Sequence, residues 1–135
     1  MYEFYGDVSL LAQHYPNMRG WTEFMLREDE EHGAPRLRTW GFHFADWLAL
    51  DNPEQGSSFG GTDEYYIASA YYYWSTLLTA KAAHALQITA DAEKYFALAS
   101  AIKAAMQQEY FTATGRLTVP TQTGLAIALA MDIAP

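Results

Sequence analysis

A short aromatic and acidic cluster carries the most informative chemistry in this sequence. Two tryptophans, Trp40 and Trp47, accompany His43, Asp46 and Asp51 within it. The face of an indole ring stacks on the apolar C–H face of a sugar, while a nearby carboxylate accepts hydrogen bonds from sugar hydroxyls. The cluster therefore suits carbohydrate binding if it lies on a loop. The alternative is that Trp40 and Trp47 close the end of a helical bundle as part of its core.

Hydrolysis of a glycoside would need two carboxylates, one on each side of the scissile bond. They lie about 5–5.5 Å apart when configuration is retained and about 6.5–9.5 Å apart when it is inverted. The sequence singles out no such pair, so it assigns no catalytic residue. Acids suit the first turn of a helix and also suit turns, which explains several of these carboxylates without catalysis. The candidates are Asp46, Asp51, Glu54, Asp63 and Glu64.

The histidines lack the spacing of a metal site, because no two are four residues apart on one helical face and no H-E-x-x-H motif occurs. The absence of cysteine excludes a thiolate metal site and a cysteine nucleophile. Neither a G-x-S-x-G nor a Walker-type phosphate motif occurs. We therefore expect no metal and no cofactor. The four histidines are His14, His32, His43 and His84.

The segment that must position the cluster is residues 32–62. Its glycines and prolines are typical of turns, not of a helix. Long ordered loops with aromatic content are usually functional. We therefore interpret residues 32–62 as a candidate sugar-subsite loop.

The helix before this loop is expected to start at the N-cap Asp7. Pro16 should interrupt that helix and open a new one, since proline suits a first turn. The pattern then fades in the acidic run 28–31, which we interpret as a solvated end.

The helices after the loop are predicted to alternate between buried and amphipathic. Thr62 or Asp63 should cap a helix that runs to about Leu86 and is apolar on nearly every face, which is typical of a buried helix. An amphipathic helix follows from Thr89 to Tyr110. A last apolar helix is expected over Leu125–Ile133, capped by Thr121 or Thr123.

Composition sets outer limits on function. The 135 residues are 50% hydrophobic and 18% charged, with a net charge of −8, which indicates one packed segment and argues against binding nucleic acid or anionic lipid. The two uncharged stretches, 65–80 and 117–131, are shorter than the about 18 apolar residues of a membrane span. Residues 1–7 lack the basic and apolar parts of a signal peptide, so we expect no export signal and leave the compartment open.

Several segments together resemble the bacterial α-L-rhamnosidases of the inverting type, which are built on an (α/α)6 toroid. The resemblance covers essentially the whole chain, in the family's order. The matching stretches are Tyr5–Asp7 with Tyr15–Trp21, Phe44–Leu48, Ala68–Tyr72 and Thr121–Ala126.

This resemblance implies an all-α fold of antiparallel helical hairpins, with residues 1–135 forming a single helical segment of a six-hairpin glycosidase toroid. It implies that Trp47 lines a rhamnose subsite and that Asp46 orients the loop or binds a hydroxyl. We add Trp40 and His43, from the same aromatic cluster, as further candidate binding residues. Ala45 stands where the family usually has glycine, so a positive φ there would strain the loop.

The family's general-acid and general-base segments have no counterpart in this sequence. We therefore expect a piece of a rhamnosidase catalytic domain that is inactive alone and binds a rhamnose-containing carbohydrate weakly at best. The competing hypothesis is a small helical scaffold or interaction domain without sugar binding. Either way, the apolar helix around Tyr65–Trp74 would be incompletely covered, which predicts a homo-oligomer.

Overall fold

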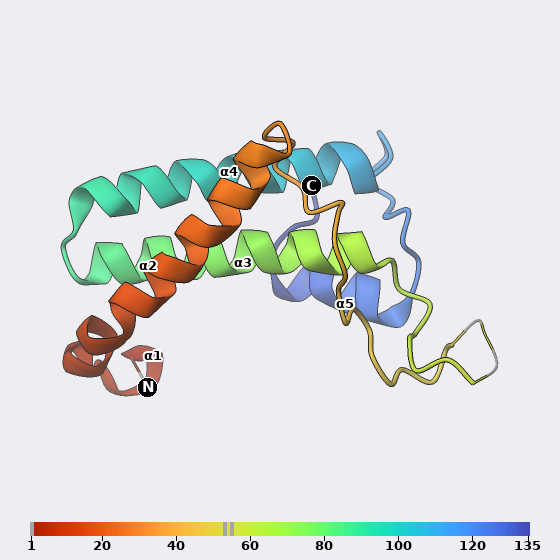
Figure 1. Cartoon of the computed structure of the whole chain (residues 1–135), viewed down its shortest axis with the longest axis horizontal. Helices are drawn as coiled ribbons and strands as arrows, with labels where there is room; N and C mark the ends of the chain where they lie inside the picture. The colour runs from red at the N-terminus through yellow and green to blue at the C-terminus, as the bar shows by residue number, and fades with distance from the viewer. Residues whose placement is uncertain (1, 53, 55) are drawn as a thin grey trace.

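The computed structural model describes residues 2–52, 54 and 56–135, and this part of the chain is all-α (Figure 1). Two isolated antiparallel bridges, Trp47 with Phe59 and Phe111 with Leu117, supply its strand-like pairing. The prediction of an all-α fold is confirmed. The helices are α1 (Tyr2–Tyr5), α2 (Val8–Glu31), α3 (Glu64–Ala85), α4 (Thr89–Tyr110) and α5 (Gln122–Ala130).

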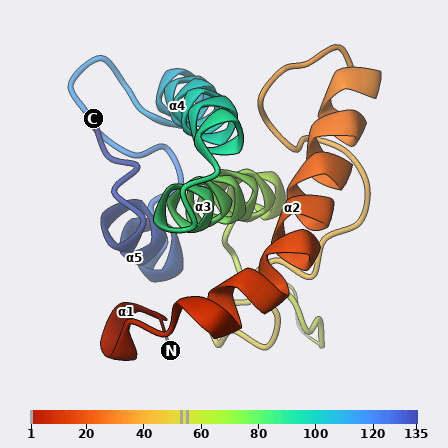
Figure 2. The same cartoon turned by 90° about the vertical axis from the view of Figure 1, so that its left-hand side faces the viewer.

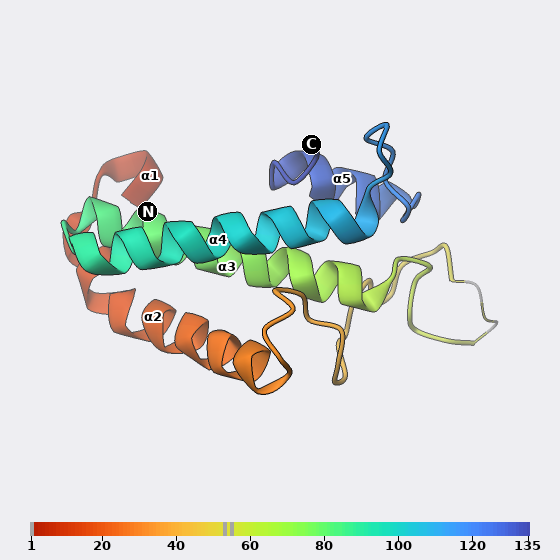
Figure 3. The ribbon, with the colours of Figure 1, turned by 90° about the horizontal axis from the view of Figure 1, so that it is seen from above.

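Helix α3 is the centre of the arrangement. It contacts α2, α4 and α5, and Figure 2 shows it nearly end-on with these three helices around it. Helices α3 and α4 run antiparallel side by side (Figure 3). The expectation of a buried helix next to an amphipathic one therefore holds, except that Tyr71 on α3 is 54% exposed.

Helix α2 begins as predicted, with the Asp7 carboxylate accepting hydrogen bonds from the backbone N–H groups of Ser9 (3.0 Å) and Leu10 (3.1 Å). The predicted break at Pro16 is wrong, because Pro16 lies inside one continuous helix. The missing N–H of a proline weakens a helix locally without having to end it, and α2 bends in its N-terminal half (Figure 2). The helix ends at Glu31.

The acidic run at the end of α2 is only partly solvated, which corrects the prediction of a solvated end. Asp29 is completely buried, whereas Glu30 and Glu31 are exposed. A buried carboxylate requires hydrogen-bonding partners, and residues distant in sequence provide them.

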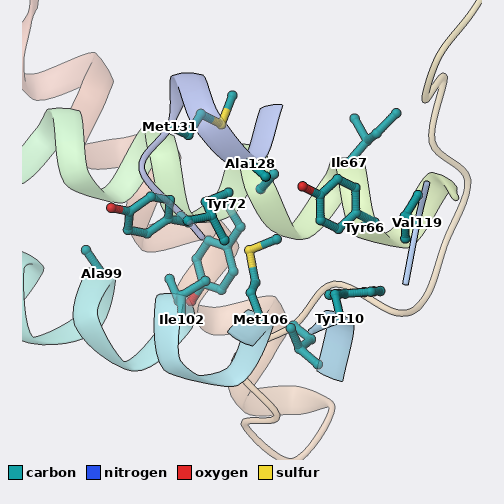
Figure 4. Close-up of a cluster of buried hydrophobic side chains, with 14 of the residues drawn as sticks. Tyr66, Ile67, Tyr72, Ala99, Ile102, Met106, Tyr110, Val119, Ala128 and Met131 are labelled. Carbon is teal, nitrogen blue, oxygen red and sulfur yellow. The ribbon is translucent and has the colours of Figure 1, made fainter. Parts of the chain in front are cut away.

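The main core surrounds α3 and includes side chains of α4 and α5, with Met25 and Leu26 of α2. Figure 4 shows Ile102 and Met106 of α4 facing Tyr66 and Tyr72 of α3, and all four side chains are fully buried. The helix predicted over Thr89–Tyr110 has these bounds in the structure.

Helix α5 begins at the predicted N-cap Thr121 but ends at Ala130, three residues before the predicted Ile133. Asp132 adopts a left-handed backbone (φ 53°), and this turns the chain back. The backbone N–H of Ile133 then donates to Ala128 O (2.9 Å), which closes the helix end. Ile133 is fully buried in the core. None of the described helices is long and apolar enough to cross a membrane.

Candidate functional site

The site is built where the loop 32–62 meets the N-terminal ends of α3 and α5. The Asp46 carboxylate accepts a hydrogen bond from the Thr62 hydroxyl (2.8 Å), and the hydroxyls of Thr62 and Thr121 are 2.7 Å apart. Thr62 directly precedes Asp63, the N-cap of α3, and Thr121 is the N-cap of α5. One chain of hydrogen bonds therefore holds the loop and both helix starts together.

Beneath this chain of hydrogen bonds, the side chain of Tyr66 joins the same two helices. Its hydroxyl donates to Gly124 O at 2.9 Å. Burial raises the pKa of this hydroxyl to about 12, so Tyr66 remains a protonated donor. The ring also packs edge to face against Tyr110 of α4, with centroids 5.1 Å apart. The base of the site is therefore rigid and part of the core.

The backbone around Asp46 forms a tight turn that orients Trp47. Ala45 (φ 49°) and Leu48 (φ 65°) are both left-handed, so the positive φ considered for Ala45 is present. The N–H groups of Ala49 and Gly60 donate to Asp46 O at 3.3 and 2.9 Å. Gly60 is required here, because a Cβ would lie 2.5 Å from Ala49 Cβ.

Trp47 belongs to a group of exposed aromatic rings, here called the aromatic shelf. Trp47 stacks on Phe44, with centroids 5.1 Å apart and planes at 30°. Phe42 packs edge-on against Phe44 and Phe59. All four rings are at least 40% exposed, so the alternative in which Trp47 closes the bundle as core is not what the structure shows. The shelf consists of Phe42, Phe44, Trp47 and Phe59.

Trp40 and His43 have different surroundings. The Trp40 ring stacks on His32 at 4.0 Å, and the Arg38 guanidinium lies 5.2 Å from its centroid. The Trp40 ring is therefore already engaged within the protein. Nε2 of His43 lies 2.9 Å from Trp40 O. Because a carbonyl oxygen only accepts, Nε2–H is the donor of this hydrogen bond, which fixes the turn between the two residues.

Two hollows open next to these residues, and Phe42 and His43 line both. One, of about 470 Å³, lies beside the shelf and is also bounded by Phe59, Thr62 and Glu64. The other, of about 370 Å³, lies between α2 and α3. Both are large enough to take a ligand of about monosaccharide size. His43 thus lines ligand-sized space, whereas Trp40, Asp46 and Trp47 line neither of these two hollows.

The nearby carboxylates serve mainly to hold the structure. Asp63 accepts from the Tyr66 N–H (2.7 Å) as the cap of α3, and Glu64 lies in the first turn, as the sequence predicts. Asp51 accepts from the Gly61 N–H (3.2 Å) and so braces the loop. Among the described residues, no group of three His, Asp or Glu side chains could hold a metal ion.

Three contributors to the site are not evident from the sequence. The sequence indicates Thr62 and Thr121 as candidate helix caps, but not that Thr62 contacts Asp46 or that Thr121 contacts Thr62. No local signal in the sequence links Phe59 to Trp47, although the bridge between them completes the shelf. Helix capping is a local signal, whereas the contacts between Asp46, Thr62 and Thr121 depend on the tertiary fold.

The described residues form antiparallel helical hairpins whose long loop presents aromatic rings and a carboxylate near the starts of two neighbouring helices. The chain belongs to the family described as the bacterial alpha-L-rhamnosidase 6 hairpin glycosidase domain, whose sequence model matches residues 1–135.

Individual relatives agree with this assignment. An alpha-L-rhamnosidase from Alteromonas sp. is 29% identical over 140 residues, covering all of this chain and 15% of the relative. The crystal structure of the Streptomyces avermitilis alpha-L-rhamnosidase complexed with L-rhamnose superposes with a TM-score of 0.76 at 29% identity, covering 100% of this chain and 12% of that one. The native enzyme from Aspergillus terreus gives a TM-score of 0.76 at 25% identity, covering 97% and 15%. The chain thus spans 12–15% of the length of these relatives.

Proposed function

We propose that this chain forms one part of an α-L-rhamnosidase catalytic domain, and that the loop 32–62 supplies part of the surface that binds a terminal α-L-rhamnoside. The observation that carries the proposal is the contrast between two neighbouring residues. Trp47 is 53% exposed on a supported shelf, whereas the Asp46 carboxylate is tied to Thr62. Trp47 is available to a ligand. Asp46 holds the turn that carries Trp47 in place through its hydrogen bond to Thr62.

The chemistry of the shelf fits rhamnose in particular. Rhamnose is a deoxy sugar whose C6 is a methyl group, so one edge of the molecule is apolar. An exposed indole supported from behind by Phe44 offers a flat apolar surface to that edge or to the C–H face of the ring. The solved relative complexed with L-rhamnose supports this choice of sugar.

The 135 residues alone are not expected to hydrolyse a glycoside. Asp46, Asp51 and Asp63 each accept a hydrogen bond that holds the loop or a helix start. In the complete enzyme, we propose, the acid and the base come from other segments and this chain orients the sugar. The test is an aryl α-L-rhamnoside assay with the pure protein. Turnover that is abolished by Asp46→Asn or Glu64→Gln would contradict this part of the proposal.

Binding is tested by titrating the ¹⁵N-labelled chain with L-rhamnose to high millimolar concentration. The expected result is a saturating shift of the Trp47 indole signal together with shifts of backbone amides in the loop 32–62, and the amide shifts should be lost in Trp47→Ala. Phe96→Ala is the matched control, because Phe96 is an exposed aromatic ring on α4 and lines neither hollow. L-mannose, which carries a hydroxyl on C6, should bind more weakly if the methyl group packs on the ring. No response of the Trp47 signal to rhamnose would refute the proposal.

A second candidate function, a helical scaffold that self-associates, rests on a separate observation. Leu125 and Leu129 on α5 are 49% and 76% exposed, and exposed apolar side chains of this kind favour association. This candidate predicts a homo-oligomer in light scattering at high micromolar concentration, with no response to rhamnose. A monodisperse monomer would count against it.

A further inference from the structure

The end of α2 contains a fully buried carboxylate with three hydrogen-bond donors. Asp29 accepts from the Arg36 guanidinium (2.5 Å), from the Arg36 backbone N–H (3.0 Å) and from the Tyr72 hydroxyl (3.2 Å). Its side chain has no exposed surface, and that of Arg36 is mostly covered. A buried charge is tolerated only when such partners surround it. Burial and the adjacent Asp29 charge raise the pKa of the Tyr72 hydroxyl, so it remains a donor.

The chain wraps around Asp29 as it leaves α2. The Ala34 N–H donates to Asp29 O at 2.7 Å. Ala34 (φ 57°) and Arg36 (φ 60°) both adopt the left-handed conformation, which is unfavourable for residues other than glycine. The contacts to Asp29 stabilise a path that these residues would not take by themselves.

The same contacts fix the loop against α3. After Arg36, Leu37 is buried, and the Arg38 N–H donates to the Ser69 hydroxyl at 2.9 Å. Ser69 and Tyr72 are three residues apart and lie on one face of α3. The start of the loop 32–62 is therefore attached to α3 directly at Ser69, and indirectly at Tyr72 through Asp29, before the chain reaches Trp40.

A continuous set of contacts leads from this attachment to the shelf. Arg38 and His32 hold the Trp40 ring, and Trp40 O contacts His43. Phe42 packs on Phe44, which stacks on Trp47. The far end of the loop is held separately by Asp46 and Thr62. The loop is thus held near its start by Asp29, through Arg36, and near its end by the hydrogen bond between Asp46 and Thr62.

We propose that Asp29, acting with Arg36 and Tyr72, is a positioning residue that sets the path of the loop 32–62 and thereby the placement of the aromatic shelf. Asp29 contacts no ligand and acts through the loop. Its influence on the loop is independent of the proposed function. Its influence on sugar binding rests on that function.

The first experiment compares Asp29→Asn with Glu23→Gln. Glu23 is a matched control, because it also lies on α2 and accepts hydrogen bonds from Lys94 and Tyr95, but these partners belong to α4 and not to the loop. Asp29→Asn should move the indole signals of Trp40 and Trp47, leave that of Trp74 on α3 in place, and accelerate proteolysis within residues 32–62 by about tenfold. Glu23→Gln should leave both loop signals and the cleavage rate unchanged, even where it lowers the unfolding midpoint. Unchanged Trp40 and Trp47 signals in folded Asp29→Asn would overturn the proposal.

Tyr72→Phe keeps the test decisive if Asp29→Asn does not fold, because it removes one donor and leaves the Arg36 contacts in place. It should move the same signals by a smaller amount, and its failure to do so would also overturn the proposal. Rhamnose titration separates the two ideas. If Tyr72→Phe binds rhamnose more weakly than Glu23→Gln does, the positioning effect of Asp29 extends to sugar binding. If the unmodified chain does not bind rhamnose at all, only the proposed function is contradicted.

Discussion

The Thr62 hydroxyl donates a hydrogen bond of 2.8 Å to the Asp46 carboxylate and lies 2.7 Å from the Thr121 hydroxyl. Thr62 is buried, so these groups have little water to replace a lost partner. A single side chain therefore couples the turn that presents Trp47 to the starts of α3 and α5.

Replacing Thr62 tests this coupling directly. Thr62→Val keeps the shape and removes the hydroxyl, which should lower the free energy of unfolding by about 1–3 kcal/mol, because a buried partner is left unpaired. Thr62→Ser retains the hydroxyl and should lose less. Urea denaturation followed by circular dichroism measures both values. Equal losses in the two variants would show that the hydrogen bonds contribute nothing to stability.

Ala45→Gly should stabilise the protein. Ala45 is left-handed, a conformation that costs an L-residue about 1–2 kcal/mol, while glycine adds about 0.4–1 kcal/mol of chain entropy to the unfolded state. The expected net gain is between about 0 and 1.6 kcal/mol, measured as a higher urea midpoint.

The control for this change is Ala104→Gly on the exposed side of α4. There the backbone is helical, so glycine should destabilise by about 1 kcal/mol. A loss of stability at both positions would show that the left-handed conformation of Ala45 carries no strain.

Tyr66 should make stability fall at alkaline pH. Burial raises the pKa of its hydroxyl from 10.0 to about 12, so the folded protein binds more protons than the unfolded chain between these values. The contribution is fully present below about pH 10 and is lost as the pH rises through about 12. Urea denaturation from pH 9 to pH 12 should therefore show a declining unfolding free energy.

The variant Tyr66→Phe identifies the source of that decline. It removes the hydrogen bond to Gly124 O and should lower stability at pH 9, but the decline above pH 10 should become shallower. Tyr110 retains its own raised pKa of about 12, caused mainly by burial, so part of the decline should remain. An unchanged slope in Tyr66→Phe would exclude this tyrosine as its origin.

Local signals in the sequence predicted most of the helical framework. The N-caps Asp7, Asp63 and Thr121 act through residues two or three positions away, and the pattern over Thr89–Tyr110 depends only on helical periodicity. These features can be read from short stretches because the interactions that produce them are themselves short in sequence.

The remaining features depend on partners distant in sequence. In the sequence, Asp29 is one of four consecutive acids and nothing distinguishes it from the others. The hydrogen bonds from Arg36 and Tyr72, which make its burial possible, are evident only in the structure. The sequence alone predicts a helix break at Pro16. The helix α2 continues through Pro16 because its packing against α3 stabilises one long helix. Trp47 lies outside the helices, as the glycines and prolines around it indicate, while the contacts of its turn with Thr62 and Phe59 appear only in the folded chain.

The short connection between α3 and α4 has a consequence for the order of folding. Only residues 86–88 separate the two helices, with Gln87 left-handed at the turn, so their contacts form with little loss of chain entropy. The loop 32–62 is a much longer connection, between α2 and α3, and ordering it costs more chain entropy before Asp46 can contact Thr62. We expect the α3–α4 hairpin to form early in refolding and to act as the template on which the loop closes last.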